Sequence, residues 1–135
     1  MGRRSRRLVA CVVLAAAIGV SAASAQAYSF VLTDIINFNL NDSSWATYGG
    51  GTQFHISSTG DGSASYRWVD DPAHSTVISA NNCGDYSSLG STPISAHDID
   101  YHLLFWGVSG QCFVLRGRTA AGAGSMTNYD GRLRR

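Results

Sequence analysis

The pattern of short apolar runs after residue 27 is the feature that most restricts how this chain can fold. Hydrophobic and polar residues alternate over short stretches, and clusters of Gly, Ser, Asn and Asp separate these stretches. Alternation with a period of two is typical of strands that bury one face, whereas an amphipathic helix needs an apolar residue at every third or fourth position. No segment after residue 27 has the helical spacing, so the sequence predicts an all-β fold.

Turn signals predict how some of these strands connect. Residues 45–57 are predicted to form a hairpin around a loop of three consecutive glycines. Segments 98–106 and 111–118 are predicted to pair as a second hairpin, which is apolar on both faces and therefore central. An Asp-Gly pair at 130–131 predicts a third, short hairpin.

The remaining strands are predicted from alternation alone. They lie at 29–40, 64–69 and 75–80, and residues 81–95 are predicted to form a loop. The expected architecture is a small β-sandwich or open barrel of about seven to nine antiparallel strands.

The first 27 residues have the three parts of a signal peptide for export. Four arginines lie between residues 3 and 7, residues 8–20 are apolar, and alanines at 23, 25 and 27 fit a cleavage site. The apolar segment is too short to span a membrane well, although an uncleaved anchor is the alternative. We therefore predict that 1–27 is removed and that 28–135 is secreted as a single all-β domain. The Arg-only basic residues and the Ala-rich leader are typical of a high-GC bacterium.

Charge and composition exclude several classes of function. Removal of the leader would leave six arginines and nine aspartates, a net charge of −3 with His neutral, which disfavours nucleic acid as a partner. The chain has no Lys and no Glu. It therefore cannot contain a P-loop lysine, a Schiff-base lysine or the H-E-x-x-H motif of zinc proteases.

Two cysteines remain after the leader, Cys83 and Cys112. An even pair in an exported protein predicts one disulfide, which closes a loop of about 30 residues and contributes about 3–4 kcal/mol in the chain-entropy model. The spacing is not C-x-x-C, so a structural crosslink is favoured over a redox site. Two cysteines cannot complete a structural zinc site, and no metal or other cofactor is predicted.

Asp98, Asp100 and His102 form the densest titratable cluster. On one strand their side chains would share a face, where they would hold a metal ion or support acid–base catalysis in a small hydrolase. The alternative, which we favour, is that Asp98 and Asp100 are surface acids with Arg118 as an ion-pair partner.

Large aromatic residues and the arginines after Cys112 are the candidates for a binding surface. Aromatic rings on β-sandwiches stack on sugars or anchor proteins, and arginines bind anions. We predict a non-enzymatic binding protein at the cell exterior whose partner is an extracellular protein, a glycan or an anionic wall polymer. A secreted antibacterial effector of the bacteriocin kind, or an inhibitor, is the alternative, and a small hydrolase is the second alternative. The predicted contact residues are Tyr66, Trp68, Trp106, Arg116, Arg118, Arg132 and Arg134.

Overall fold

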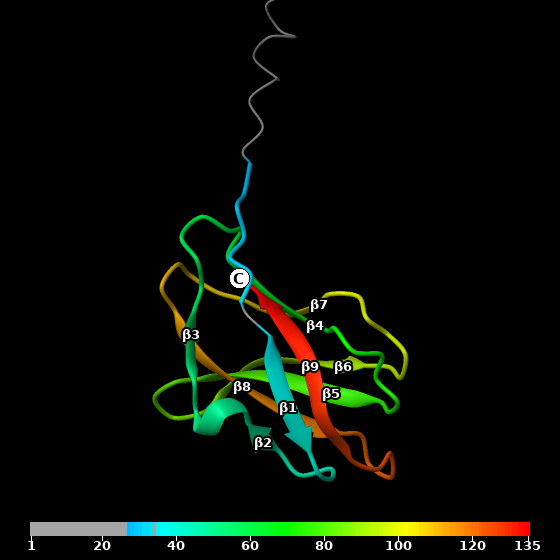
Figure 1. Ribbon diagram of the computed structural model, residues 1–135. Coiled ribbons are helices and arrows are strands. Elements are labelled where there is room, and N and C mark those ends of the chain that lie inside the picture. The colour runs from blue at the N-terminus through cyan, green and yellow to red at the C-terminus, as the bar shows by residue number, and fades with distance from the viewer. Residues whose placement is uncertain (1–26, 34) are drawn as a thin grey trace, which may run out of the picture.

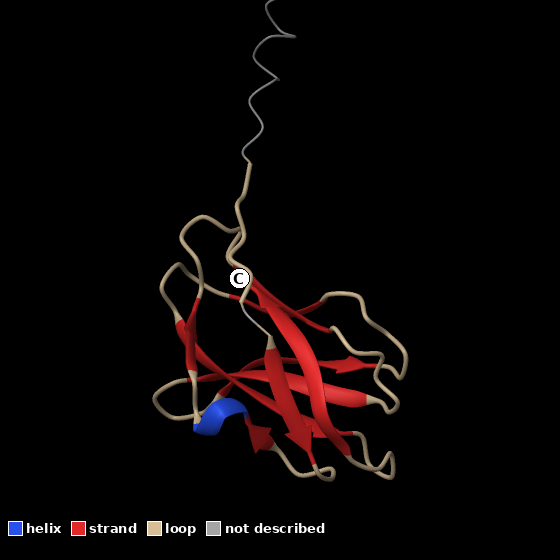
Figure 2. Cartoon of the chain, viewed as in Figure 1, coloured by secondary structure: helices blue, strands red, loops and turns tan. Residues whose placement is uncertain are grey.

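Two packed antiparallel sheets make up the described part of the protein (Figure 1). The computed structural model describes residues 27–33 and 35–135, so the predicted signal peptide lies, apart from residue 27, outside the described part. The described residues form nine strands and one short 3-10 turn, which confirms the all-β prediction (Figure 2). Within those ranges, no helix has the length and apolar character needed to cross a membrane.

The two sheets differ in strand number and order. Sheet A has the order β1-β9-β4-β7, and sheet B has the order β2-β8-β5-β6 with β3 paired to the other end of β8. The strands of sheet A are β1 (Ile36–Leu40), β9 (Met126–Arg134), β4 (Ser63–Trp68) and β7 (His102–Trp106). The strands of sheet B are β2 (Ala46–Thr47), β3 (Gln53–His55), β5 (Thr76–Asn82), β6 (Ser88–Ile94) and β8 (Cys112–Thr119), with the turn η2 (Tyr48–Gly50) between β2 and β3.

The core lies between the sheets and is built around aromatic rings. The ring centroid of Trp68 lies 5.2 Å from that of Tyr66 and 6.0 Å from that of Phe38, both edge-on. The indole N–H of Trp68 donates to the Thr76 hydroxyl at 3.0 Å, which joins sheet A to sheet B and satisfies the only polar atom of the ring. Tyr66 and Trp68 are both fully buried. The prediction that they belong to a binding surface is therefore wrong, because the core claims the largest apolar areas.

The sheets also touch along one side, where the edge strands β6 and β7 meet. Gly90 of β6 lies against the backbone carbonyl of Leu104 in β7, and a Cβ at this position would overlap that oxygen. The close approach of the two strands therefore requires a glycine. Residues 81–95 were predicted to form a loop, but they include the strand β6. Pro93 is tolerated in β6 because β6 is the edge strand of its sheet.

The predicted hairpin of 98–106 with 111–118 is not formed. β7 pairs with β4 in sheet A, whereas β8 is central in sheet B, so residues 107–110 cross from one layer to the other. Phe105 and Phe113 do meet, but as rings across the core with centroids 5.1 Å apart. Two apolar strands joined by a short glycine loop satisfy the same pattern whether they pair or face each other.

The other two predicted hairpins fail for related reasons. β2 and β3 do not pair with each other, since both pair with β8 and the three glycines carry the chain from one to the other. β9 runs without a break through the Asp-Gly pair. Gly131 is needed there because the Tyr66 hydroxyl lies where its Cβ would be. Gly131 therefore serves packing, and the three glycines after Tyr48 adopt positive φ in a compact turn that is not a hairpin turn.

The disulfide between Cys83 and Cys112 is formed, as predicted. It ties the loop after β5 to the start of β8, on the outer side of sheet B. The disulfide is compatible with an oxidising compartment outside the cytoplasm.

Candidate functional site

The residues predicted to form one binding surface lie in several separate places. Tyr66 and Trp68 are in the core. β8 turns its odd-numbered side chains inward, so Arg116 and Arg118 lie on the outer face of sheet B. β9 turns Leu133 inward, so Arg132 and Arg134 lie on the outer face of sheet A. Trp106 ends β7, also on the outer side of sheet A.

The outer face of sheet A gathers three arginines from two adjacent strands. Arg67 of β4 is directly opposite Arg132 of β9, and Ser65 is opposite Arg134. Side chains directly opposite each other in an antiparallel pair have Cβ atoms about 4.5–5.5 Å apart. Sheet pairing therefore brings three cationic side chains onto one surface, which we call the arginine face (Arg67, Arg132 and Arg134).

Within the described ranges, no arginine forms an ion pair with an aspartate. The ion pairs there are His97 with Asp71 and His102 with Asp98, each at 2.9 Å. Like charges directly opposite each other destabilise a sheet. The Arg67–Arg132 pair is therefore a feature that folding alone does not favour. The Arg67 guanidinium donates to the Ile99 carbonyl at 3.5 Å, and neither guanidinium has a carboxylate partner among the described residues.

Aromatic rings hold two of these guanidinium groups in place. The Arg134 guanidinium lies 4.5 Å from the ring centroid of Tyr101 and 4.8 Å from that of Phe30. The Arg67 guanidinium lies 5.6 Å from the Tyr101 ring. Each such cation–π contact contributes about 0.5–1 kcal/mol at an exposed site. Tyr101 therefore limits the freedom of the arginine side chains without neutralising them.

Beside the arginine face lies an open hollow with a volume of about 420 Å³. Arg67 and Arg132 contribute two positive charges to its wall, and Asp100 contributes one negative charge. Two exposed aliphatic side chains, Leu32 and Ile99, and the Tyr101 ring complete it. Such a wall suits a ligand with an anionic group on a body that also has apolar surface.

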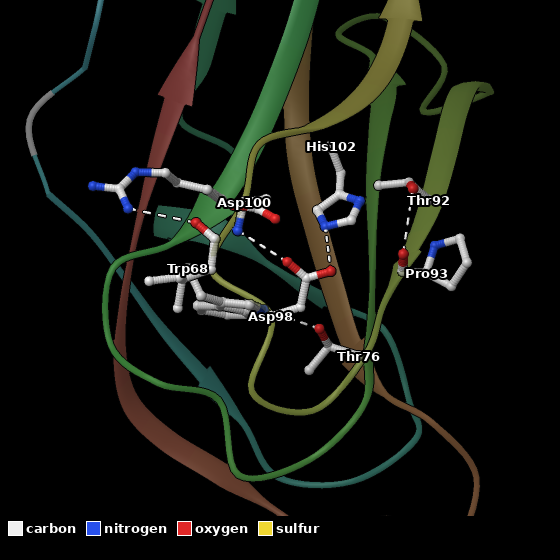
Figure 3. A network of polar contacts seen from close by, with 9 residues as sticks. Trp68, Thr76, Thr92, Pro93, Asp98, Asp100 and His102 are labelled. Atoms are coloured by element: carbon white, nitrogen blue, oxygen red, sulfur yellow. Dashed lines mark hydrogen bonds and ion pairs between the residues drawn. The ribbon is translucent and has the colours of Figure 1, made fainter.

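The loop that carries Tyr101 is held by the carboxylate of Asp98 (Figure 3). The backbone N–H of Asp100 donates to Oδ1 of Asp98 at 2.9 Å, and Oδ2 of Asp98 lies 2.9 Å from Nε2 of His102. The N–H of Asp100 first, and then His102 through its charge and its hydrogen bond, hold the pKa of Asp98 below its usual range. Asp98 is thus a positioning residue for one edge of the hollow.

The predicted cluster of Asp98, Asp100 and His102 therefore takes another form. Asp98 and Asp100 lie in the loop before β7, and His102 contacts Asp98 but not Asp100. The predicted ion pair with Arg118 is absent because β7 and β8 belong to different sheets. Over 27–33 and 35–135, no three His, Cys, Asp or Glu side chains gather as metal ligands.

The outer face of sheet B carries its two arginines in a different setting. The guanidinium groups of Arg116 and Arg118 lie 5.7 and 5.1 Å from the ring centroid of Trp45. Arg118 is opposite Val77, and Arg116 is opposite Ser79, so neither faces a like charge.

A loop held by the disulfide covers part of the same face. Asn81 donates from Nδ2 to the Tyr86 carbonyl at 2.8 Å and accepts from the Ser79 hydroxyl at 2.7 Å. Both Ser79 and Asn81 are buried although they point away from the core. The polar groups here are therefore engaged within the protein.

Sequence reasoning missed Arg67 and Tyr101, yet one signal for Arg67 was present. Residues 64–69 alternate Tyr66 and Trp68 with Arg67. Once the two large rings are assigned to the core, Arg67 must point outward beside the arginines of β9. Tyr101 had no such signal, because its place depends on the loop that Asp98 holds.

Comparison of the chain with protein-family models, with curated proteins and with solved structures finds no match. The chemistry of the two outer faces is therefore the basis on which a function is assigned.

Proposed function

We propose that the protein is an exported, non-enzymatic binding protein that takes an anionic partner through the outer face of sheet A. The observation that carries this proposal is the direct pairing of Arg67 with Arg132. Neither of these arginines has an acidic partner among the described residues. An anion between them would remove the repulsion and accept charge-assisted hydrogen bonds from both planar guanidinium groups.

Export is supported by the sequence and by the crosslink. The leader has the basic, apolar and small-residue segments of a signal peptide. The Cys83–Cys112 disulfide belongs to the oxidising compartments in which exported proteins fold. A partner at the cell exterior follows from this location.

The hydrogen bond between Asp98 and His102 is the observation that favours the second candidate, a small hydrolase. A catalytic histidine also needs a nucleophile or an activated water within reach. The nearby Thr92 hydroxyl donates to the Pro93 carbonyl at 3.4 Å, and no hydroxyl bonds to His102 within the described ranges (Figure 3). The binding function is supported better, because Asp98 has a positional role.

Two matched double variants test the binding function. R67S/R132S and R116S/R118S remove the same charge from opposite faces of the sandwich. We expect the sheet A variant to weaken binding of the purified, oxidised protein to polyanions by about tenfold or more, since it removes two charge-assisted contacts.

The probes are polygalacturonate, poly-glutamate and polyphosphate, measured by affinity electrophoresis and calorimetry. The sheet B variant should change affinity by less than about twofold. Equal losses in the two variants, or no binding of any polyanion by the unaltered protein, would overturn the proposal.

A further inference from the structure

The described residues just before β1 continue the edge of sheet A, beside the end of β9 (Figure 1). The backbone N–H of Val31 donates to the Arg135 carbonyl at 2.7 Å, and the N–H of Arg135 donates to the Val31 carbonyl at 3.0 Å. Leu32 and Arg134 form the next pair of this antiparallel ladder. The residue that follows a hydrogen-bonded pair turns its own N–H and C=O to the other side of the strand. The backbone polar groups of Leu32 therefore point away from β9, toward the edge of the sheet.

A second hollow, of about 350 Å³, lies against this edge, and we call it the edge hollow. Ile35 is exposed and Ile36 is buried, as consecutive side chains of a strand point to opposite faces, yet both line the edge hollow. A hollow that touches both faces of one strand lies at the edge of that strand. Phe54 of β3 and Tyr48 of η2 line its other wall. The edge hollow therefore lies between an edge of sheet A and an edge of sheet B.

The two sides of the sandwich treat their strand edges differently. On one side β6 and β7 meet and cover each other. On the side of the edge hollow, the stretch from Tyr28 to Thr33 has no charged side chain and no proline, which are the usual devices that stop an edge from pairing. Val31 is 38% exposed and Leu32 is 53% exposed. Within the described ranges, this edge is thus apolar and suited to pairing with another strand.

We infer that two copies of the protein pair through this edge as an antiparallel dimer whose two-fold axis passes beside Leu32. The N–H and C=O of Leu32 in each copy bond to those of Leu32 in the other copy. The two Leu32 side chains meet on the outer face of sheet A, where Arg134 also lies. Val31 points to the opposite face and extends toward the edge hollow of the second copy. This inference does not depend on the proposed function.

A second copy fits this edge because one surface supplies both halves of the contact. A two-fold dimer needs a self-complementary surface, and here exposed aliphatic side chains lie beside a hollow with apolar walls. Charge does not oppose the arrangement, since the nearest arginines of the two copies, at position 134, are three strand spacings apart, about 14 Å. That separation exceeds the Debye length of about 10 Å at 0.1 M salt.

The dimer also places the two arginine faces together. Sheet A has four strands in each copy, and edge pairing joins the two sheets into one continuous sheet. A two-fold axis perpendicular to the sheet keeps both outer faces on the same side. The arginine faces of the two copies therefore lie side by side, where one long polyanion could contact both.

Two leucine variants on opposite edges of sheet A test the dimer. L32D places two carboxylates next to the two-fold axis, and L103D places the same charge on β7, where Leu103 is 44% exposed. Because a contact of this size is weak, we expect the unaltered, oxidised protein to dimerise with a dissociation constant of about 10–100 μM. L32D should raise this constant by about tenfold or more, since like charges meet directly, and L103D by less than about twofold. Sedimentation velocity at protein concentrations from about 5 to 500 μM measures the three constants.

A proline variant keeps the inference testable if L32D alters the fold. L32P removes the outward N–H, which the ladder with β9 does not use, and circular dichroism verifies that each variant is folded. L32P should also abolish the dimer. Hydrogen exchange of the unaltered protein gives a second measurement, because the Leu32 amide should exchange more slowly as the protein concentration rises. A protein that stays monomeric at about 500 μM, equal losses in L32D and L103D, or a dimer that survives both L32D and L32P would show that the inference is wrong.

Discussion

The two outer faces of the sandwich carry the same cation in different surroundings. On sheet B, Arg116 and Arg118 lie opposite neutral residues and against one indole ring. On sheet A, Arg67 lies opposite Arg132, and two of the three guanidinium groups contact Tyr101. The difference teaches that a count of arginines does not identify a binding surface. The residue across the strand distinguishes the two faces, because Arg67 faces a like charge whereas Arg116 and Arg118 face neutral residues.

The two faces also differ in the loop that lies over sheet B. The loop between β5 and β6 is fixed by the disulfide and engages Asn81 of sheet B through the carbonyl of Tyr86. The aliphatic walls of the hollow beside sheet A are about half exposed among residues 27–33 and 35–135. Sheet B therefore has the features of a stabilising face, and sheet A is the face that we propose for contact with a partner.

The largest expected effect comes from removing the crosslink on sheet B. C83S/C112S should lower the free energy of unfolding by about 3–4 kcal/mol, because the loop between the cysteines gains entropy in the unfolded state. Urea denaturation followed by tryptophan fluorescence measures this loss. Binding to polygalacturonate per folded molecule should not change. A parallel fall in affinity would show that the two faces are coupled.

Single arginine variants should have smaller effects on the free energy of unfolding, and the sign of the effect should differ between the two faces. R118S should lower the free energy of unfolding by about 0.5–1 kcal/mol through loss of its contact with Trp45. R132S should raise it by a few tenths of a kcal/mol, since a like-charge pair across two strands is removed.

Salt provides the control for this pair of variants. The gain in R132S should shrink as ionic strength rises and screens the repulsion, whereas the loss in R118S should change less. Denaturation midpoints at low and high NaCl measure both trends. If R132S is as destabilised as R118S, the arginine face serves stability and the contrast between the faces disappears.

The sequence predicted the strand content and the crosslink because both follow from local pattern. Alternation located β4 and β5 closely, and an even pair of cysteines left one possible disulfide. Strand partners were not predictable in the same way. A glycine loop between two apolar strands is compatible with a hairpin and with a crossing between layers. In the folded protein it is a crossing, with Phe105 packed against Phe113 between the sheets.

The sequence predicted only part of the candidate site, because alternation does not determine which strands pair or which face is buried. Alternation separates Arg67 from Tyr66 and Trp68, but it does not say which side faces solvent. The core decides this, since burying the two rings removes far more apolar area than burying one arginine stem. The pairing of Arg67 with Arg132 joins strands 65 positions apart, and such register is a property of the folded sheets.

The smallest effect is expected from changing two loop carboxylates, Asp85 on the side of sheet B and Asp98 on the side of sheet A. The backbone N–H of Ser87 holds the pKa of Asp85 below its usual range in the loop over sheet B, and the N–H of Asp100 does the same for Asp98 beside the hollow. A carboxylate with a lowered pKa adds stability above its unfolded pKa of about 3.9, and this contribution is lost as pH falls through the lower folded value.

D85N and D98N should therefore each weaken the dependence of unfolding free energy on pH across the acid range, from about pH 5 downward. Urea denaturation at a series of pH values measures this slope against the unaltered protein. At neutral pH only D98N should also reduce affinity for polygalacturonate, because Asp98 positions the loop that carries Tyr101, whereas Asp85 acts on the opposite face. If D85N reduces the affinity as much as D98N, the hollow on sheet A is not the binding site.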